Sequence, residues 1–382
     1  MRRRDALAAV AAVCLAGWWP TVPALATEVP IVRVGILLQQ AAIRLEADGP
    51  LVAFDVRSGA TTTLIGAPWV LQPTGDGMAV PGTSFGPTVR FTAPTGFVRA
   101  EGQPYRGSIE VRRTPAGRLT AINELDLERY LYGVIKGEMD PRWPAEALKA
   151  QAVAARTLAL QNLEELRGKF ASEGYTLRAT TDSQVYLGFS GEAPGAIAAV
   201  DGTRGIVMTF RGQPIFAAYH SNSGGHTEDS ENVWGTAHPY LRGVPDPQAL
   251  DAPDEQWTAR LSLAFVEAAL RRGGVGLTGI VSIEPARITP WGRLVTLRLA
   301  DEAGHRREIG ANLFRLLIGP GVIRSTMFVV NREGADVAFV GRGSGHGVGL
   351  DQWGARGLAL RGSTFEQILS YYYTGITIEH RY

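Results

Sequence analysis

The sequence predicts an α+β fold, in which a β-rich N-terminal portion precedes a mixed α/β lobe with a long helix. Glycine and proline are frequent, with 46 and 22 among 382 residues, and they separate short apolar runs, as is typical of strands joined by turns. After residue 125 the apolar residues instead recur at helical spacing. Because 45% of the residues are hydrophobic and 20% are charged, the chain can bury a substantial core.

The first 26 residues are expected to be a secretory signal peptide rather than part of the fold. Arg2, Arg3 and Arg4 precede an apolar stretch at 6–19, and Ala24-Leu25-Ala26 fits the small-residue pattern of a cleavage site. The stretch is shorter than the ~20 apolar residues that span a bilayer, which argues against a membrane anchor. Cys14, the single cysteine, lies inside this segment. We therefore expect an exported protein, in the periplasm, in the cell wall or outside the cell, that is cleaved at about Ala26 and contains no cysteine.

Residues 27–120 are expected to form the β-rich region. Their short runs are β-branched or alternate apolar with polar side chains, and turn residues separate them. The expected strands are residues 32–38, 42–46, 51–56, 89–91 and 108–111.

Residues 121–382 are expected to form the mixed lobe. One helix is predicted over 127–136 and a longer one over 144–166, where Pro144 suits the first turn and Gly168 supplies a stop. Small residues recur along the longer helix, so another element can pack closely against it. The remaining expected elements are a strand pair at 206–210 and 214–219, an insertion with one helix and a hairpin at 255–330, and final helices at 353–360 and 364–373.

Glu138 stands just before the turn that leads into the longer helix, and a rigid turn can hold a carboxyl group in place. Lys149 and Arg156 are seven residues apart on that helix, so they share a face that could lie near Glu138. A nearby cation would favour the ionised carboxylate, whereas burial beside Met139 and Trp143 would raise the pKa toward that of a general acid. The sequence leaves both open, and a surface salt bridge is the simpler alternative.

A second polar cluster spans residues 219–228 and follows an apolar strand. His220, Ser221 and Ser223 precede two glycines, which allow the backbone to approach a ligand closely. The cluster is therefore either a substrate wall or a polar turn. A metal-dependent site with His220, His226 and Glu228 as ligands is a further alternative, although their spacing is not a recognised zinc pattern.

Two more clusters complete the candidate site. In residues 341–354 glycines alternate around His346, but the spacing fits neither the P-loop nor the dinucleotide fingerprint, which excludes nucleotide binding. A buried, structural histidine is the alternative for His346. In residues 181–186 the amide of Gln184 and the ring of Tyr186 suit a sugar, while a turn closed by Asp182 is the simpler interpretation. The formal net charge of +1 argues against a nucleic-acid binder.

These clusters together resemble the SpoIID/LytB family of sporulation protein D and amidase enhancers. The similarity extends over about residues 31–377, and the motifs occur in the family's order. They include Gly137-Glu138-Met139 with Ala145-Glu146-Ala147-Leu148-Lys149-Ala150-Gln151, Ser183-Gln184-Val185-Tyr186, Tyr219-His220-Ser221-Asn222-Ser223-Gly224-Gly225, and Gly345-His346-Gly347-Val348-Gly349-Leu350 with Gln352-Trp353-Gly354-Ala355.

The resemblance implies a lytic transglycosylase that cleaves peptidoglycan glycan strands, particularly strands stripped of stem peptides. The mixed lobe would then be the catalytic lobe, and Glu138 matches the family's catalytic glutamate, acting as acid and then as base to form a 1,6-anhydro product. No second carboxylate is needed, because the nucleophile belongs to the substrate. The expected substrate-binding residues are Lys149, Arg156, Gln184, Tyr186, His220, Ser221, Ser223, His346 and Gln352.

Two other functions remain open at this stage. The family also contains amidase enhancers, so the chain can be a non-catalytic wall-binding protein whose partner is a cell-wall amidase. Alternatively, the chain is a metal-dependent hydrolase. Some family members hold zinc with histidine and cysteine, but this chain has no cysteine near His220 and His226, so no cofactor is expected.

Overall fold

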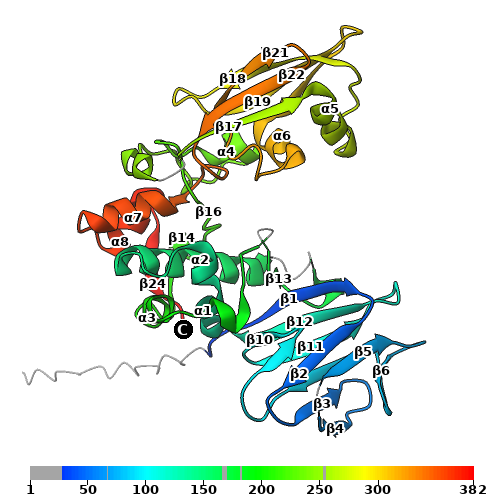
Figure 1. Cartoon of the computed structure of the whole chain (residues 1–382). Coiled ribbons are helices and arrows are strands. Elements are labelled where there is room, and N and C mark those ends of the chain that lie inside the picture. Colours follow the sequence, from blue (N-terminus) through cyan, green and yellow to red (C-terminus); the bar gives the residue numbers. More distant parts are fainter. Residues whose placement is uncertain (1–27, 67, 166–169, 181–182, 253–254) are drawn as a thin grey trace, which may run out of the picture.

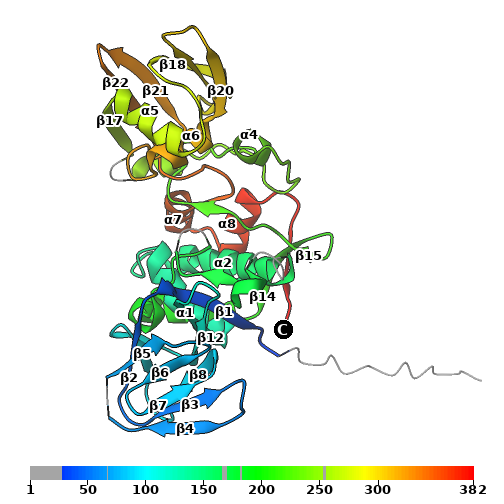
Figure 2. The ribbon, with the colours of Figure 1, turned by 90° about the vertical axis from the view of Figure 1, so that its right-hand side faces the viewer.

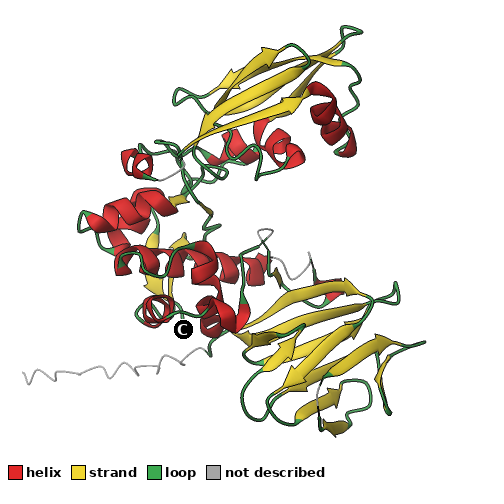
Figure 3. Cartoon of the chain, viewed as in Figure 1, coloured by secondary structure: helices red, strands yellow, loops and turns green. Residues whose placement is uncertain are grey.

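The computed structural model describes residues 28–382 except 67, 166–169, 181–182 and 253–254. The expected signal peptide, Asp182 and the expected end of the long helix at Leu166 lie outside these residues. The fold is α+β, as the sequence predicts, and the elements form three tiers (Figure 1). Strands dominate the two outer tiers, and most helices gather in the middle one (Figure 3). None of the described helices is long and apolar enough to cross a membrane.

The N-terminal tier consists of two β-sheets that pack face to face. Their strands are β1 (Ile31–Gln40), β2 (Ile43–Ala47), β3 (Leu51–Asp55), β4 (Thr61–Leu64), β5 (Trp69–Pro73), β6 (Met78–Val80), β7 (Thr83–Phe85), β8 (Thr88–Thr92), β9 (Val98–Ala100), β10 (Gln103–Tyr105), β11 (Ser108–Arg113), β12 (Leu119–Asp126) and β13 (Leu177–Arg178). The strand orders are β13-β1-β12-β11-β8-β3-β4 and β10-β9-β2-β5-β6-β7.

The alternation of buried apolar and more exposed side chains explains why these residues form strands. Val32 and Val34 on β1, and Ile43 and Leu45 on β2, are fully buried, while their neighbours along each strand are more exposed. The five strands expected from the sequence are confirmed. The β-region runs beyond the expected boundary at residue 120, because β12 pairs with β1 as far as Asp126.

The middle tier is built around the long helix. Its elements are α1 (Leu127–Glu138), α2 (Ala145–Glu165), α3 (Pro194–Asp201), α4 (Ser230–Trp234), α7 (Gln352–Leu360) and α8 (Phe365–Tyr372), with strands β14 (Ile206–Phe210), β15 (Gln213–Pro214), β16 (Tyr219–His220), β23 (Leu350–Asp351) and β24 (Thr377–His380), and the short 3-10 helices η1 (Ala171–Glu173), η2 (Gly188–Gly191) and η3 (Pro247–Asp251).

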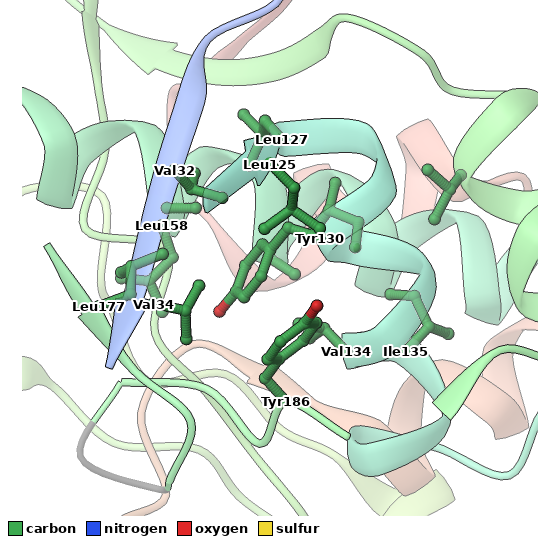
Figure 4. Close-up of a cluster of buried hydrophobic side chains, with 14 of the residues drawn as sticks. Val32, Val34, Leu125, Leu127, Tyr130, Val134, Ile135, Leu158, Leu177 and Tyr186 are labelled. Carbon is green, nitrogen blue, oxygen red and sulfur yellow. The ribbon is translucent and has the colours of Figure 1, made fainter. Parts of the chain in front are cut away.

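Particular side chains determine where these helices begin and how closely they pack. The Asp126 side chain accepts a hydrogen bond from the Arg129 N–H and so caps α1. Buried alanines lie all along α2, among them Ala147, Ala150 and Ala154, and α1, α3, α7 and α8 all pack against it. The close packing expected of the small residues is thus confirmed. The tier joins the N-terminal sheets through an apolar cluster (Figure 4).

The outer C-terminal tier is an insertion with its own hydrophobic core. It contains β17 (Gln256–Ser262), α5 (Leu263–Arg272), β18 (Ile280–Ile288), β19 (Leu294–Asp301), β20 (Arg306–Gly310), α6 (Ala311–Ile318), β21 (Phe328–Glu333) and β22 (Asp336–Arg342). The expectation of one helix and a hairpin ending at residue 330 falls short. Besides the hairpin of β18 and β19, the tier contains a second helix, α6, and further strands, of which β22 pairs with both β17 and β21. Phe314 and Phe339 centre a core separate from that of the rest of the chain.

The insertion leaves and re-enters the middle tier at neighbouring points. Tyr219 pairs with Leu350 and His220 with Asp351, so β16 and β23 lie parallel on either side of the insertion in the sequence. In two perpendicular views the inserted tier lies beyond α7 and α8, on the side away from the N-terminal sheets (Figure 2). The middle tier is therefore assembled from two separate stretches of chain.

Candidate active site

Glu138 is the last residue of α1, and its carboxylate is held from two sides. The Val185 N–H donates to Oε1 at 2.8 Å, and the Gln352 amide nitrogen lies 3.5 Å from Oε2. The segment of Val185 can approach because residue 137 is glycine, where a Cβ atom would meet the Val185 carbonyl oxygen at 2.7 Å. The sequence thus brings three distant segments together around one carboxyl group.

Burial raises the pKa of Glu138, and hydrogen bonds from the Val185 N–H, the Tyr219 hydroxyl and the Gln352 amide oppose that rise. Of the two alternatives that the sequence leaves open, burial is among the causes of this shift and a nearby cation is not. Lys149 pairs with Glu146 at 2.8 Å on its own helix, so it is committed elsewhere. The carboxyl group is accordingly a weaker acid than an exposed glutamate, and it retains its proton closer to neutral pH.

Arg156, which the sequence analysis expects to bind the substrate, has a completely buried side chain. Its guanidinium donates to both carboxylate oxygens of Glu128, at 2.9 and 2.7 Å, and to the carbonyl oxygens of Val200 and Ile206. The exposed fractions of the Arg156 and Glu128 side chains are 0% and 1%. A buried group with this set of partners supports the fold and is not available to a substrate.

Gln184 also lies below the surface, as part of a network that ends at Glu138. Its amide donates to the Tyr219 hydroxyl and to the Ala155 carbonyl oxygen, both at 3.1 Å, and its carbonyl oxygen accepts from the Tyr130 hydroxyl at 3.1 Å. Because Tyr219 acts on Glu138, the network fixes the surroundings of the acid. Gln184 is therefore placed to support the site rather than to grip a sugar.

Tyr186 is the second residue of its cluster that the structure removes from the surface. Its hydroxyl donates to the Asn123 side chain at 2.7 Å, and its ring lies 5.0 Å from that of Tyr130. Both rings belong to the apolar cluster between α1 and the N-terminal sheet (Figure 4). Aromatic and polar side chains occur in hydrophobic cores as well as in sugar-binding sites, and Tyr186 is part of the core.

His220, the last residue of β16, and His346 lie side by side, with ring centroids 5.4 Å apart. Nδ1 of His220 is 3.1 Å from the Val348 carbonyl oxygen, whereas Nδ1 of His346 accepts from the Val348 N–H. Burial lowers the pKa of both rings, helped by the positive charges of Arg293 and Arg315, and that of His346 falls to about 3. Both histidines are thus neutral near pH 7. His220 is buried, while His346 is half-buried beside Trp234.

The alternative metal ligands are used in other ways. The His226 ring stacks on Trp291 at 3.9 Å, and its Nδ1 is 2.6 Å from the Thr227 carbonyl oxygen. Glu228 accepts hydrogen bonds from the Asn232 side chain and the backbone of residue 229. Within the described part of the chain, no three His, Cys, Asp or Glu side chains gather as a metal would require.

A buried pair of carboxyl groups, not expected from the sequence, supports Gln352. Asp351 accepts from the Ser223 N–H at 2.6 Å and from the Gly354 N–H at 2.9 Å, which caps α7 immediately before Gln352. Asp246 lies against it and accepts from the Ser223 and Tyr372 hydroxyls. Burial and the charge of Asp351 raise the pKa of Asp246, so the pair holds a proton. Ser223 thus anchors a helix cap, while Ser221 is half-buried and its carbonyl oxygen accepts from the Trp353 N–H.

The raised pKa of Asp246 predicts an unusual pH dependence of stability. The folded state binds this proton more tightly than the unfolded chain does. The contribution of Asp246 to the free energy of unfolding is therefore full below about pH 4 and is lost as the pH rises toward the folded pKa. Asp246→Asn keeps a neutral hydrogen-bonding side chain. We expect its stability relative to wild type to increase between about pH 5 and pH 8, by up to about 1.4 kcal/mol per pH unit, as measured by unfolding midpoints.

Asp55 offers a matched control of opposite sign. It is also buried, but three backbone N–H groups, those of Gly86, Ser58 and Arg57, outweigh burial and lower its pKa. Its contribution is therefore present above the unfolded pKa and is lost as the pH falls, so Asp55→Asn should lower the midpoint most at about pH 8. If both variants lost the same stability at that pH, the conclusion that Asp246 is protonated in the folded state would be wrong.

Comparison with known proteins shows the family to which this sequence belongs. Residues 115–210, which include Glu138 and Val185, match the family model described as SpoIID, stage II sporulation protein. Stage II sporulation protein D of Bacillus subtilis is 31% identical over 283 residues, which cover 71% of this chain and 78% of that protein. An uncharacterised protein of Brachyspira hyodysenteriae is 35% identical over 260 residues, or 68% of each chain.

The amidase enhancer of Bacillus subtilis is also similar, with 31% identity over 292 residues. The match covers 65% of this chain but only 40% of that longer protein. Stage II sporulation protein D of Bacillus amyloliquefaciens adds 30% identity over 75% of its length. From the matched family model and these relatives, the chain belongs to the SpoIID/LytB family.

Proposed function

We propose that this chain is a lytic transglycosylase that cleaves peptidoglycan glycan strands between N-acetylmuramic acid and N-acetylglucosamine, with peptide-stripped strands as the preferred substrate. The observation that carries the proposal is Glu138, a carboxyl group whose pKa is raised by burial while three hydrogen-bond donors surround it. A general acid needs a proton near neutral pH, and burial supplies that condition. The family's association with the cell wall makes a glycan strand the fitting substrate.

The proposed reaction uses Glu138 twice. The protonated carboxyl group first donates to the glycosidic oxygen as the bond between that oxygen and C1 of the muramic acid breaks. The resulting carboxylate then takes the proton of the C6 hydroxyl, and O6 forms a new bond to C1. The products are a strand with a free hydroxyl end and a 1,6-anhydro end, and Glu138 returns to its protonated form.

The neighbours of Glu138 suit both steps. The Val185 N–H, the Tyr219 hydroxyl and the Gln352 amide are neutral donors, so they stabilise the carboxylate once its proton has left without preventing protonation beforehand. Glycosidases that use water or a covalent intermediate need a second carboxylate. In the proposed reaction the nucleophile belongs to the substrate, so no second carboxylate is required.

The product decides between mechanisms. Purified protein incubated with peptide-stripped glycan strands is expected to release 1,6-anhydro ends, which mass spectrometry distinguishes from reducing ends by the loss of one water. Activity that persists with a chelator agrees with the proposal, whereas activity that a chelator removes supports a metal-dependent hydrolase. Reducing ends without anhydro ends would overturn the transglycosylase assignment.

A second function is favoured by the similarity to an amidase enhancer. In that case the chain binds the wall without cutting it and activates a cell-wall amidase as its partner. The same preparation tests this alternative, because it predicts no anhydro product from glycan strands but faster release of stem peptides when an amidase and intact peptidoglycan are supplied together.

A further inference from the structure

One face of α7, the helix that begins at Gln352, lines a small cavity. Trp353, Arg356, Gly357 and Leu360 follow one another at helical spacing, and so they share that face. Gln248 and Arg361 complete the lining of a cavity of about 200 Å³. Pockets for whole small-molecule ligands typically measure ~300–1,000 Å³, so this cavity suits a substituent of a sugar better than a sugar ring.

Arg356 is held over two tryptophans at this cavity. The rings of Trp143 and Trp353 meet edge to face, with centroids 4.7 Å apart. The guanidinium of Arg356 lies 5.8 Å from the centroid of Trp143 and 5.3 Å from that of Trp353. All three residues are half-buried, so this aromatic platform fixes the cation while part of it faces solvent.

Arg356 has no anionic partner among the described residues. Other arginines close to the site do: Arg142 pairs with Asp140, and Arg156 pairs with Glu128. Arg356 forms neither an ion pair nor a hydrogen bond within the described part of the chain, although its five N–H groups suit a carboxylate. A fixed guanidinium beside a cavity, with Arg361 also in its lining, is a receptor for a small anion.

Each tryptophan of the platform belongs to a segment that also contributes to the surroundings of the proposed catalytic acid. Trp353 directly follows Gln352, whose amide reaches Glu138, and Trp143 lies in the turn after Glu138. From Gln352 to Arg356 the helix advances about 6 Å along its axis. A sugar bound at Glu138 would therefore bring its own substituents, or those of the next sugar, to Arg356.

We propose that Arg356 binds the lactyl carboxylate of a muramic acid residue next to the cleaved bond, and so selects glycan strands from which the stem peptides have been removed. The inference rests on the proposed function and names the feature of the substrate that is recognised. A stripped muramic acid carries a free carboxylate, whereas an attached stem peptide converts it to a neutral amide, which forms no ion pair with a guanidinium. Arg356 is therefore a specificity-determining residue.

Binding measurements test this without cleavage of the ligand. The full chain with Glu138→Gln is titrated with three ligands: peptide-stripped glycan strands, the same strands with their lactyl carboxylates converted to methylamides, and chitin oligosaccharides, which lack the lactyl group. We expect the free-acid strands to bind about tenfold more tightly than the amidated strands. Arg356→Gln in the same background should remove that preference, leave the other two ligands unaffected, and be partly rescued by Arg356→Lys.

Arg260 supplies the matched control, because it is an exposed arginine of the inserted tier that pairs with Glu333. Arg260→Gln makes the same change of charge and should preserve the preference. An Arg356→Gln protein that still prefers the free acid, or that loses affinity for all three ligands equally, would overturn the inference. Failure of the proposed function is seen separately, as wild-type protein that forms no anhydro ends, since the carboxylate preference is measured by binding alone.

Discussion

Glu138→Gln is expected to lower the rate of anhydro-end formation by about 10²–10⁴-fold, the range contributed by general acid–base groups. Glutamine keeps the shape of glutamate, and its side-chain carbonyl oxygen can still accept from the Val185 N–H. It has no proton of suitable acidity for the glycosidic oxygen, and it cannot take the proton of the C6 hydroxyl. Mass spectrometry of released ends, followed over time, measures the loss.

Two comparisons make this result specific. Binding of peptide-stripped strands should survive in Glu138→Gln, because only the proton-transfer group is altered. Glu146, eight residues later, is the matched control: it pairs with Lys149 and accepts from the Phe365 N–H, so Glu146→Gln should leave the rate nearly unchanged. A Glu138→Gln protein that forms anhydro ends at the wild-type rate would remove Glu138 from the mechanism.

Arg156→Met is expected to cost about 3–5 kcal/mol of folding free energy, the typical loss when one partner of a buried ion pair is removed. Methionine fills much of the space but leaves the carboxylate of Glu128 buried and without its bidentate partner. Burial raises the pKa of Glu128, and at present the hydrogen bonds and charge of Arg156 outweigh it and lower that pKa. The midpoint of thermal unfolding should fall by roughly 4–7 °C, as measured by calorimetry.

A double variant shows how much of the lost stability comes from the ion pair and how much from the lost packing of the side chain. Glu128→Met combined with Arg156→Met removes both charges and should recover a large part of the loss, because no unpaired charge then remains buried. Arg298, which pairs with Glu308 on the surface, is the control, and Arg298→Gln should cost less than about 1 kcal/mol. If Arg156→Met cost no more than Arg298→Gln, the buried pair would not have the energetic weight assigned to it.

Local patterns predicted the elements of this fold well. The strands near the N-terminus, the helix that ends at Glu138, the long helix after it and the strand at 206–210 follow from alternation, helical spacing and turn residues. The expected partner strand at 214–219 is instead reduced to the two-residue strands β15 and β16 at its ends. The inserted tier is only partly predicted, because no sequence signal links β22 to β17 across more than sixty intervening residues.

The environments of single side chains could not be predicted in the same way. Lys149 and Arg156 share a face of α2, but different neighbours cover the successive turns of that face. The ring of Phe365 lies near Lys149, whereas the backbone of Val200 and Ile206 and the carboxylate of Glu128 enclose Arg156. Helical spacing tells which residues lie on one face and not what lies opposite them.

The polar side chains near residue 185 illustrate the same limit. An amide and a phenol suit a sugar, yet the partners of Gln184 and Tyr186 are Tyr130, Tyr219 and Asn123, which are distant in the sequence. Asp351 had a local signal, since it stands two residues before the helix predicted at 353–360. Asp246 had none, because only the folded chain brings it to Asp351.

The parallel pairing of β16 with β23 has a consequence for the order in which the protein assembles. Gln352 is made 214 residues after Glu138, so the acid has no amide partner while the intervening chain is being synthesised. Within the inserted tier, Gln256 pairs with Arg342, so folding of that tier brings its entry and exit together. This replaces the closure of a very long loop by that of a short one and lowers its entropic cost. Because Gln352 follows the inserted tier in the sequence, the amide partner of Glu138 is added only after that tier has been synthesised.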